Sequence, residues 1–261
     1  MDDTDHPLTG AAVIRRRYGS DESQYGQLHL PAGGRRPGTV IVIHGGFWKA
    51  QYGADLGAPL AADLAARGWA AWNLEYRRVG NGGGWPNTMA DVAAGIDLLA
   101  ELGLDLGRVV AIGHSAGGHL ATWAAGRPKL PDTAVGGAPL VRLTGVIAQA
   151  GVLDLVQGAA DGLGSMAVPA LLGGMPDEVP ERYRLASPRH QLPLGVPVRC
   201  VHSPDDDTVP FSQSADYVQT ARAAGDDASL IEVTGGHFGV IDPASAAWQA
   251  ILGLLPDLLA G

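Results

Sequence analysis

The chain has 261 residues, of which 46% are hydrophobic and 17% charged, and its formal net charge at pH 7 is −9. Disorder is excluded, because this share of apolar residues is enough for one large core, and we expect a single domain over residues 1–261. Nucleic acid is excluded as a partner, since phosphate binding needs a basic face that the 18 Lys and Arg do not supply.

Residues 1–7 are acidic and polar, whereas a secretory signal has a positive segment followed by an apolar run. We therefore expect a cytoplasmic protein. No membrane association is expected, because the sequence has no uninterrupted run of about 18 apolar residues. Cys200 is the single cysteine, which excludes an internal disulfide.

The first half of the chain alternates between strand and helix patterns. Residues 12–31 alternate between apolar and polar, which predicts two opening strands, and the Gly- and Pro-rich stretch 33–38 predicts a turn. Residues 39–43 are continuously apolar and β-branched, which is typical of a buried parallel strand. Apolar residues then recur at helical spacing over 56–65, and Gly68 stands where a glycine ends a helix.

The same alternation continues to the end of the chain. Further strands are expected at 69–76, 108–112, 145–148, 196–201 and 229–233, and helices at 88–102, 116–126, 212–224 and 244–259. Right-handed crossovers would place these helices on both faces of a mostly parallel sheet, so the expected fold class is α/β. Residues 152–195 fit no strand and contain five prolines, and we expect an insertion or cap there, within the same domain.

A candidate nucleophile lies between a predicted strand and a predicted helix. Residues 113–117 read Gly-His-Ser-Ala-Gly, the G-x-S-x-G form in which a serine sits on a tight turn. The motif alone is weak evidence in a chain with 38 glycines. Here, however, it follows the apolar strand 109–112 and precedes a helix, as the motif requires, and we predict Ser115 as the nucleophile.

A serine nucleophile needs a base to take its proton and an acid to orient that base, and both are found downstream. In this type of fold the acid follows a late strand and the histidine follows the last strand. Of the eight histidines, His237 is the one beyond the last predicted strand, which predicts it as the base. Asp205, Asp206 and Asp207 follow the strand at 196–201; we favour Asp206, and the other two stay open as alternatives.

The loop after the first buried strand supplies candidate oxyanion donors. Residues 44–48 read His-Gly-Gly-Phe-Trp, similar to the turns that present backbone N–H groups to a developing oxyanion. The predicted donors are the amides of Gly46 or Phe47 together with that of Ala116. His44 is expected to be a hydrogen-bonded structural residue.

Aromatic residues next to these loops predict an apolar substrate pocket, although aromatic side chains are also ordinary core residues. The residues assigned to this pocket are Trp48, Tyr52, His114 and Phe238. No metal-binding, P-loop or dinucleotide motif is present, so we expect no metal and no cofactor. The expected partner is a small-molecule substrate; a homodimer is left open.

At these positions the chain resembles the α/β-hydrolase esterases and arylformamidases, notably kynurenine formamidase-like proteins and small bacterial carboxylesterases. The resemblance covers nearly the whole chain and is carried by residues 44–48 (HGGFW), 75–77 (EYR), 113–120 (GHSAGGHL), 187–188 (SP), 206–210 (DDTVP) and 237–238 (HF). It implies cofactor-free hydrolysis of a small ester or N-aryl formamide through an acyl-serine intermediate. It also implies Asp206 as the acid, because the family places its acid four residues before the proline of a similar Val-Pro pair.

Two other functions remain open on the same fold, since a fold does not fix a function. One is a non-catalytic binding or receptor protein. The other is acyl transfer to an acceptor other than water, which would use the same residues.

Overall fold

A computed structural model describes residues 12–260, and the acidic start of the chain at residues 1–7 lies outside them. The described chain contains an eight-stranded sheet in the order β1-β2-β4-β3-β5-β6-β7-β8. β2 pairs antiparallel with β1 and with β4, and every other pair of neighbouring strands is parallel. The strands are β1 (Ala12–Arg17), β2 (Tyr25–Leu30), β3 (Thr39–Ile43), β4 (Ala70–Leu74), β5 (Val109–His114), β6 (Gly145–Gln149), β7 (Val198–His202) and β8 (Ala228–Glu232).

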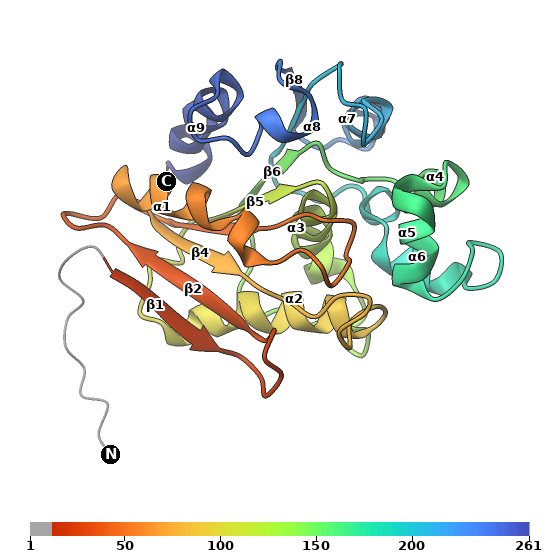
Figure 1. Ribbon diagram of the computed structural model, residues 1–261, viewed down its shortest axis with the longest axis horizontal. Coiled ribbons are helices and arrows are strands. Elements are labelled where there is room, and N and C mark those ends of the chain that lie inside the picture. The colour runs from red at the N-terminus through yellow and green to blue at the C-terminus, as the bar shows by residue number, and fades with distance from the viewer. Residues whose placement is uncertain (1–11, 261) are drawn as a thin grey trace.

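Helices cover both faces of this sheet (Figure 1). The helices are α1 (Ala58–Ala66), α2 (Asn87–Asp97), α3 (Ala116–Gly126), α4 (Leu155–Ala160), α5 (Leu163–Leu172), α6 (Pro180–Ala186), α7 (Ser212–Ala223), α8 (Gly236–Gly239) and α9 (Ala246–Leu259). Along β3, Ile41 packs in the cluster that contains α2 and α3, whereas its neighbour Val42 packs in the cluster that contains α1 and α9. Successive side chains of a strand point to opposite faces, so a strand covered on both sides is apolar throughout.

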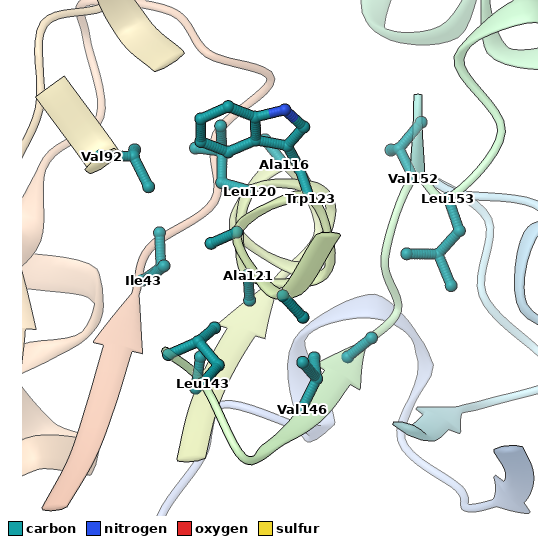
Figure 2. Packing of buried hydrophobic residues seen from close by; sticks show 14 of the residues in the cluster. Ile43, Val92, Ala116, Leu120, Ala121, Trp123, Leu143, Val146, Val152 and Leu153 are labelled. Carbon is teal, nitrogen blue, oxygen red and sulfur yellow. The ribbon is translucent and has the colours of Figure 1, made fainter. Parts of the chain in front are cut away.

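Helix α3 is buried along its whole length. Figure 2 shows Leu120 and Trp123 of this helix between Val92 of α2 on one side and Val152 and Leu153 on the other. Because apolar side chains enclose the helix, its first turn has a fixed position against the end of β5. The residue that joins β5 to α3 is therefore held by packing on both sides.

The predicted α/β class, with a mostly parallel sheet and helices on both faces, is confirmed. The helix predicted at 88–102 is shorter, because α2 ends at Asp97 and a tighter 3-10 turn, Leu98–Glu101, follows it. Residues 152–195 form α4, α5, α6 and a 3-10 turn, and the three helices gather beside one end of the sheet (Figure 1). Over residues 12–260, no helix has the length and apolar character that crossing a bilayer requires.

Candidate active site

Ser115 lies on the tight turn between β5 and α3. Its backbone has φ 55° and ψ −117°, a conformation that costs energy for any residue with a side chain. Two glycines make the turn possible, because a Cβ at Gly113 would collide with the Gly117 carbonyl and a Cβ at Gly117 would collide with the Ile43 carbonyl. This is the strand-turn-helix geometry of the G-x-S-x-G motif, which presents a serine hydroxyl at the carboxyl end of the sheet.

His237 and Asp206 come from the segments after the last two strands. His237 lies in the short helix α8, which follows β8 in the chain, and Asp206 follows β7. The imidazole Nδ1 of His237 lies 2.7 Å from the Asp206 carboxylate Oδ2. Asp205 and Asp207 are exposed, and neither carboxylate contacts His237 in the described structure. Of the three candidate aspartates, Asp206 is therefore the one that contacts the imidazole.

Asp206 is held in its ionised form. Burial raises the pKa of this carboxyl, but hydrogen bonds from His202, His237 and the Val209 amide outweigh burial and hold the pKa well below its ordinary value. An ionised carboxylate only accepts hydrogen bonds, so the His237 Nδ1 carries the hydrogen of the 2.7 Å contact. In the neutral imidazole the Nε2 is then free to accept a proton, which is the tautomer that a general base needs.

The histidine that precedes the serine links the turn of Ser115 to His237. His114 donates from Nε2 to the His237 carbonyl at 2.9 Å, and the two imidazole centroids are 4.6 Å apart. Within residues 12–260 the Ser115 hydroxyl makes no hydrogen bond to His237. In free enzymes such bonds are often long and tighten only when substrate binds.

The loop after β3 lies directly against the turn of Ser115. A Cβ at Gly45 would come within 3.0 Å of the Ser115 Cβ. Gly46 and Phe47 both have positive φ, at 104° and 51°. The amides of Gly46, Phe47 and Ala116 donate to no acceptor among residues 12–260. All three predicted oxyanion donors therefore lie in turns that meet at the serine, with no acceptor among residues 12–260.

A buried ionic network supports this loop from below. His44 Nε2 lies 2.9 Å from Glu75 Oε1, and the Arg78 guanidinium contacts the same oxygen. Glu75 Oε2 accepts from the Ala54 amide at 2.9 Å. Tyr76 stacks on the His44 ring and donates its hydroxyl to the His44 carbonyl at 2.8 Å. Burial opposes ionisation of Glu75, but the hydrogen bond with His44 and the charge of Arg78 lower its pKa overall, so the hub of the network is anionic.

The four residues assigned to a substrate pocket fall into two groups. Tyr52 and Phe238 are exposed, at 38% and 64%. Trp48 is completely buried, and its indole donates to His119 Nδ1 at 3.2 Å. His114 is also buried, and its ring holds the backbone of α8. Assigning Trp48 and His114 to the pocket lining does not fit the structure, because hydrogen bonds to buried partners hold both rings beneath the site.

Sequence reasoning did not single out His202 and Arg78, two buried polar residues that contact the carboxylates of the site. His202 is the last residue of β7, and its Nε2 lies 3.0 Å from Asp206 Oδ2. The available signal was its position, because a polar residue that ends an otherwise apolar strand lies at the edge where active sites form. Among residues 12–260, no three His, Cys, Asp or Glu side chains are grouped so that they could hold a metal ion.

Comparison with known proteins identifies the family. The sequence model of the BD-FAE family matches residues 27–220, which is more than half of the chain. The chain belongs to the BD-FAE family. Among curated proteins, this BD-FAE chain is 28% identical to "Probable carboxylic ester hydrolase LipM" of Mycobacterium tuberculosis, over 95% of its own length. It spans 63% of the length of that relative.

Solved structures share the fold of this BD-FAE chain. A truncated carbohydrate esterase from gut microbiota has a TM-score of 0.83 at 22% identity and covers 97% of this chain and 98% of its own. Esterase B of Lactobacillus rhamnosis has a TM-score of 0.79 at 22% identity, covering 95% and 85%. The Est2 esterase of Thermogutta terrifontis has a TM-score of 0.74 at 24% identity, covering 96% and 91%. At these identities the comparisons establish the α/β-hydrolase fold.

Proposed function

We propose that this protein hydrolyses small carboxylic esters, with Ser115 as nucleophile, His237 as general base and Asp206 as the acid that orients the base. The proposal rests on one observation, which is the 2.7 Å contact between Asp206 and His237 beside the strained turn that carries Ser115. The family and the esterase relatives support the same reaction class.

The reaction follows from the positions of these groups. As the Ser115 Oγ attacks the ester carbonyl carbon, His237 Nε2 takes the hydroxyl proton, and Asp206 stabilises the resulting imidazolium. The carbonyl oxygen becomes an oxyanion, which the free amides of Phe47 and Ala116 would bind. The C–O bond then breaks, the alcohol leaves with the proton from His237, and an acyl-serine remains. Water activated by the same imidazole releases the acid and restores the serine.

The exposed aromatic residues beside the site support an apolar substrate. Tyr52 packs against Gly46, and the ring centroid of Phe238 lies 5.1 Å from that of His237. Both rings remain accessible, so they can contact an acyl or alcohol group of a substrate. An N-aryl formamide would react through the same atoms, and the resemblance to arylformamidases keeps it as the second substrate class.

The decisive experiment replaces Ser115 with alanine. We expect Ser115→Ala to abolish hydrolysis of short p-nitrophenyl esters and labelling by a fluorophosphonate probe. Ser20→Ala, which changes an exposed serine, should leave both unchanged. Hydrolysis that survives in Ser115→Ala would reject the proposal, and wild-type protein that neither reacts with the probe nor turns over ester would favour a binding protein.

A second experiment ranks the substrate classes. It compares the hydrolysis rates of aryl formamides with those of acetyl and butyryl esters, and added alcohol detects acyl transfer.

A further inference from the structure

A second histidine contacts the carboxylate that orients His237. The side chains of His202 and Asp206 are both completely buried, and His202 Nε2 lies 3.0 Å from Asp206 Oδ2. His237 Nδ1 lies 2.7 Å from the same oxygen. One carboxylate oxygen therefore lies between two imidazoles, and only one of them, His237, is the candidate base.

The hydrogen bonds of His202 determine which of its nitrogens carries the hydrogen. Nε2 faces two acceptors, the Asp206 carboxylate and the Val209 carbonyl at 3.1 Å, so Nε2 must be the donor. Nδ1 faces the Ser214 hydroxyl of α7 at 2.8 Å, which can donate its own hydrogen. The Nε2–H tautomer of His202 thus satisfies every polar contact of its buried ring.

The carboxylate of Asp206 is held at both oxygens. Oδ1 accepts from the Thr208 and Val209 amides, each at 2.8 Å. A turn about the Cβ–Cγ bond would move both oxygens together, so these two bonds oppose that turn at Oδ1. The contact with His202 opposes the same turn at Oδ2, which is the oxygen that His237 contacts.

We propose that His202 is a positioning residue that aims Asp206 Oδ2 at His237 and shares its negative charge. This inference rests on the proposed function, because it assigns His202 a role in the same reaction. Without His202, Oδ2 would keep His237 as its only donor, and the carboxylate would hold that imidazole less firmly. Proton transfer in the transition state would suffer, whereas substrate binding would not.

A matched pair of variants separates this role from simple core packing. His202→Gln keeps an N–H donor near the position of Nε2, whereas His202→Leu fills a similar volume without a donor. We expect His202→Leu to lower kcat by roughly tenfold to a hundredfold, in line with the loss of a hydrogen bond to a charged group, with KM unchanged. His202→Gln should recover most of this loss. A residue that merely fills space would give two variants of equal activity.

Nuclear magnetic resonance supplies a readout that does not depend on turnover. In wild-type protein labelled with nitrogen-15 in its histidine rings, we expect His202 to be protonated at Nε2 and bare at Nδ1. The strongly deshielded Nδ1 proton of His237, typical of a histidine bonded to a carboxylate, should keep its position in His202→Gln and shift in His202→Leu, because Oδ2 there has lost its second donor.

The outcomes distinguish this inference from the proposed function. If His202→Leu has the kcat of the wild type and the chemical shift of its His237 Nδ1 proton is unchanged, the positioning role is overturned, even if Ser115→Ala is inactive. Activity that survives in Ser115→Ala would instead overturn the proposed function. If His202→Leu does not fold, the wild-type spectrum tests whether His202 donates to Asp206 from Nε2. A hydrogen on His202 Nδ1 with none on Nε2 would contradict that contact.

Discussion

Burial sets the protonation of the histidines beneath the site. Burial, with the nearby charge of His237, lowers the pKa of His114 to about 3, and burial lowers that of His119 to about 4. Both rings are therefore neutral at neutral pH, and each donates from Nε2 to a backbone carbonyl, His114 to His237 and His119 to Ala186. The two rings thus act as fixed donors that hold the backbone.

The neutral state of His119 makes stability depend on pH. Its folded pKa of about 4 lies below the ordinary value of 6.5, so between these values the unfolded chain binds more protons than the folded chain. The free energy of unfolding should therefore fall as the pH drops from 6.5 toward 4, with a contribution from His119 of up to about 1.4 kcal/mol per pH unit. Urea unfolding at several pH values should show a flatter dependence in His119→Gln than in wild type.

His190→Gln is the matched control for this measurement, because it makes the same substitution at an exposed histidine. It should keep the wild-type pH dependence. Equal slopes in wild type and His119→Gln would show that the burial of His119 does not govern its titration.

At the scale of elements, the site is assembled from the carboxyl ends of parallel strands. β3 leads into the oxyanion loop, β5 into Ser115, β7 into Asp206 and α8 follows β8. β3 and β5 are buried on both faces, so their ends have fixed positions, and so do the loop after β3 and the turn of Ser115 that follow them. The Glu75 network ties the end of β4 to the loop after β3.

Replacing Glu75 with glutamine tests how strongly this network holds the loop. Glu75→Gln leaves the buried Arg78 without its anionic partner, and removing one member of a buried ion pair costs about 3 kcal/mol. We expect that loss in the free energy of unfolding, together with a lower kcat, because the amide of Phe47 is carried by the loop that His44 anchors. Denaturant unfolding and ester kinetics on one preparation measure both effects.

The chain offers a close control in α6. Glu181 pairs with Arg184 at the same sequence spacing of three residues, but both side chains are exposed, at 64% and 57%. Glu181→Gln should change neither stability nor turnover measurably, because solvent screens an exposed pair. If Glu75→Gln and Glu181→Gln have the same free energy of unfolding and the same kcat, the buried Glu75 network does not stabilise the loop after β3.

At the scale of the whole molecule, the periodic spacing of apolar residues predicted the sheet and its main helices. Segments without that spacing were not predicted. The strand at 39–43 matches β3 and the helix at 116–126 matches α3, because continuous apolar runs and helical spacing are local signals. Residues 152–195 carry prolines and glycines that interrupt such spacing, so their helices were not foreseen. The partners of Trp48 and His202 lie far along the chain or in another element, and no local pattern reports them.

The α5 segment touches the oxyanion loop, and this contact links the inserted helices to the site. Gly164 has φ 59°, and a Cβ there would collide with the Phe47 ring. Lys49 also donates from Nζ to the Gly164 carbonyl at 2.8 Å. Gly164→Ala should therefore displace Phe47 and lower kcat/KM for esters severalfold. It should also lower the free energy of unfolding by roughly 1 kcal/mol, which is the cost of alanine at a positive φ.

Gly103 is the matched control, because it has a similar φ of 62° with no atom within 4 Å of its would-be Cβ. Gly103→Ala should thus show the stability loss alone, and an equal fall in kcat/KM in both variants would mean that backbone strain, and not the contact with Phe47, alters turnover.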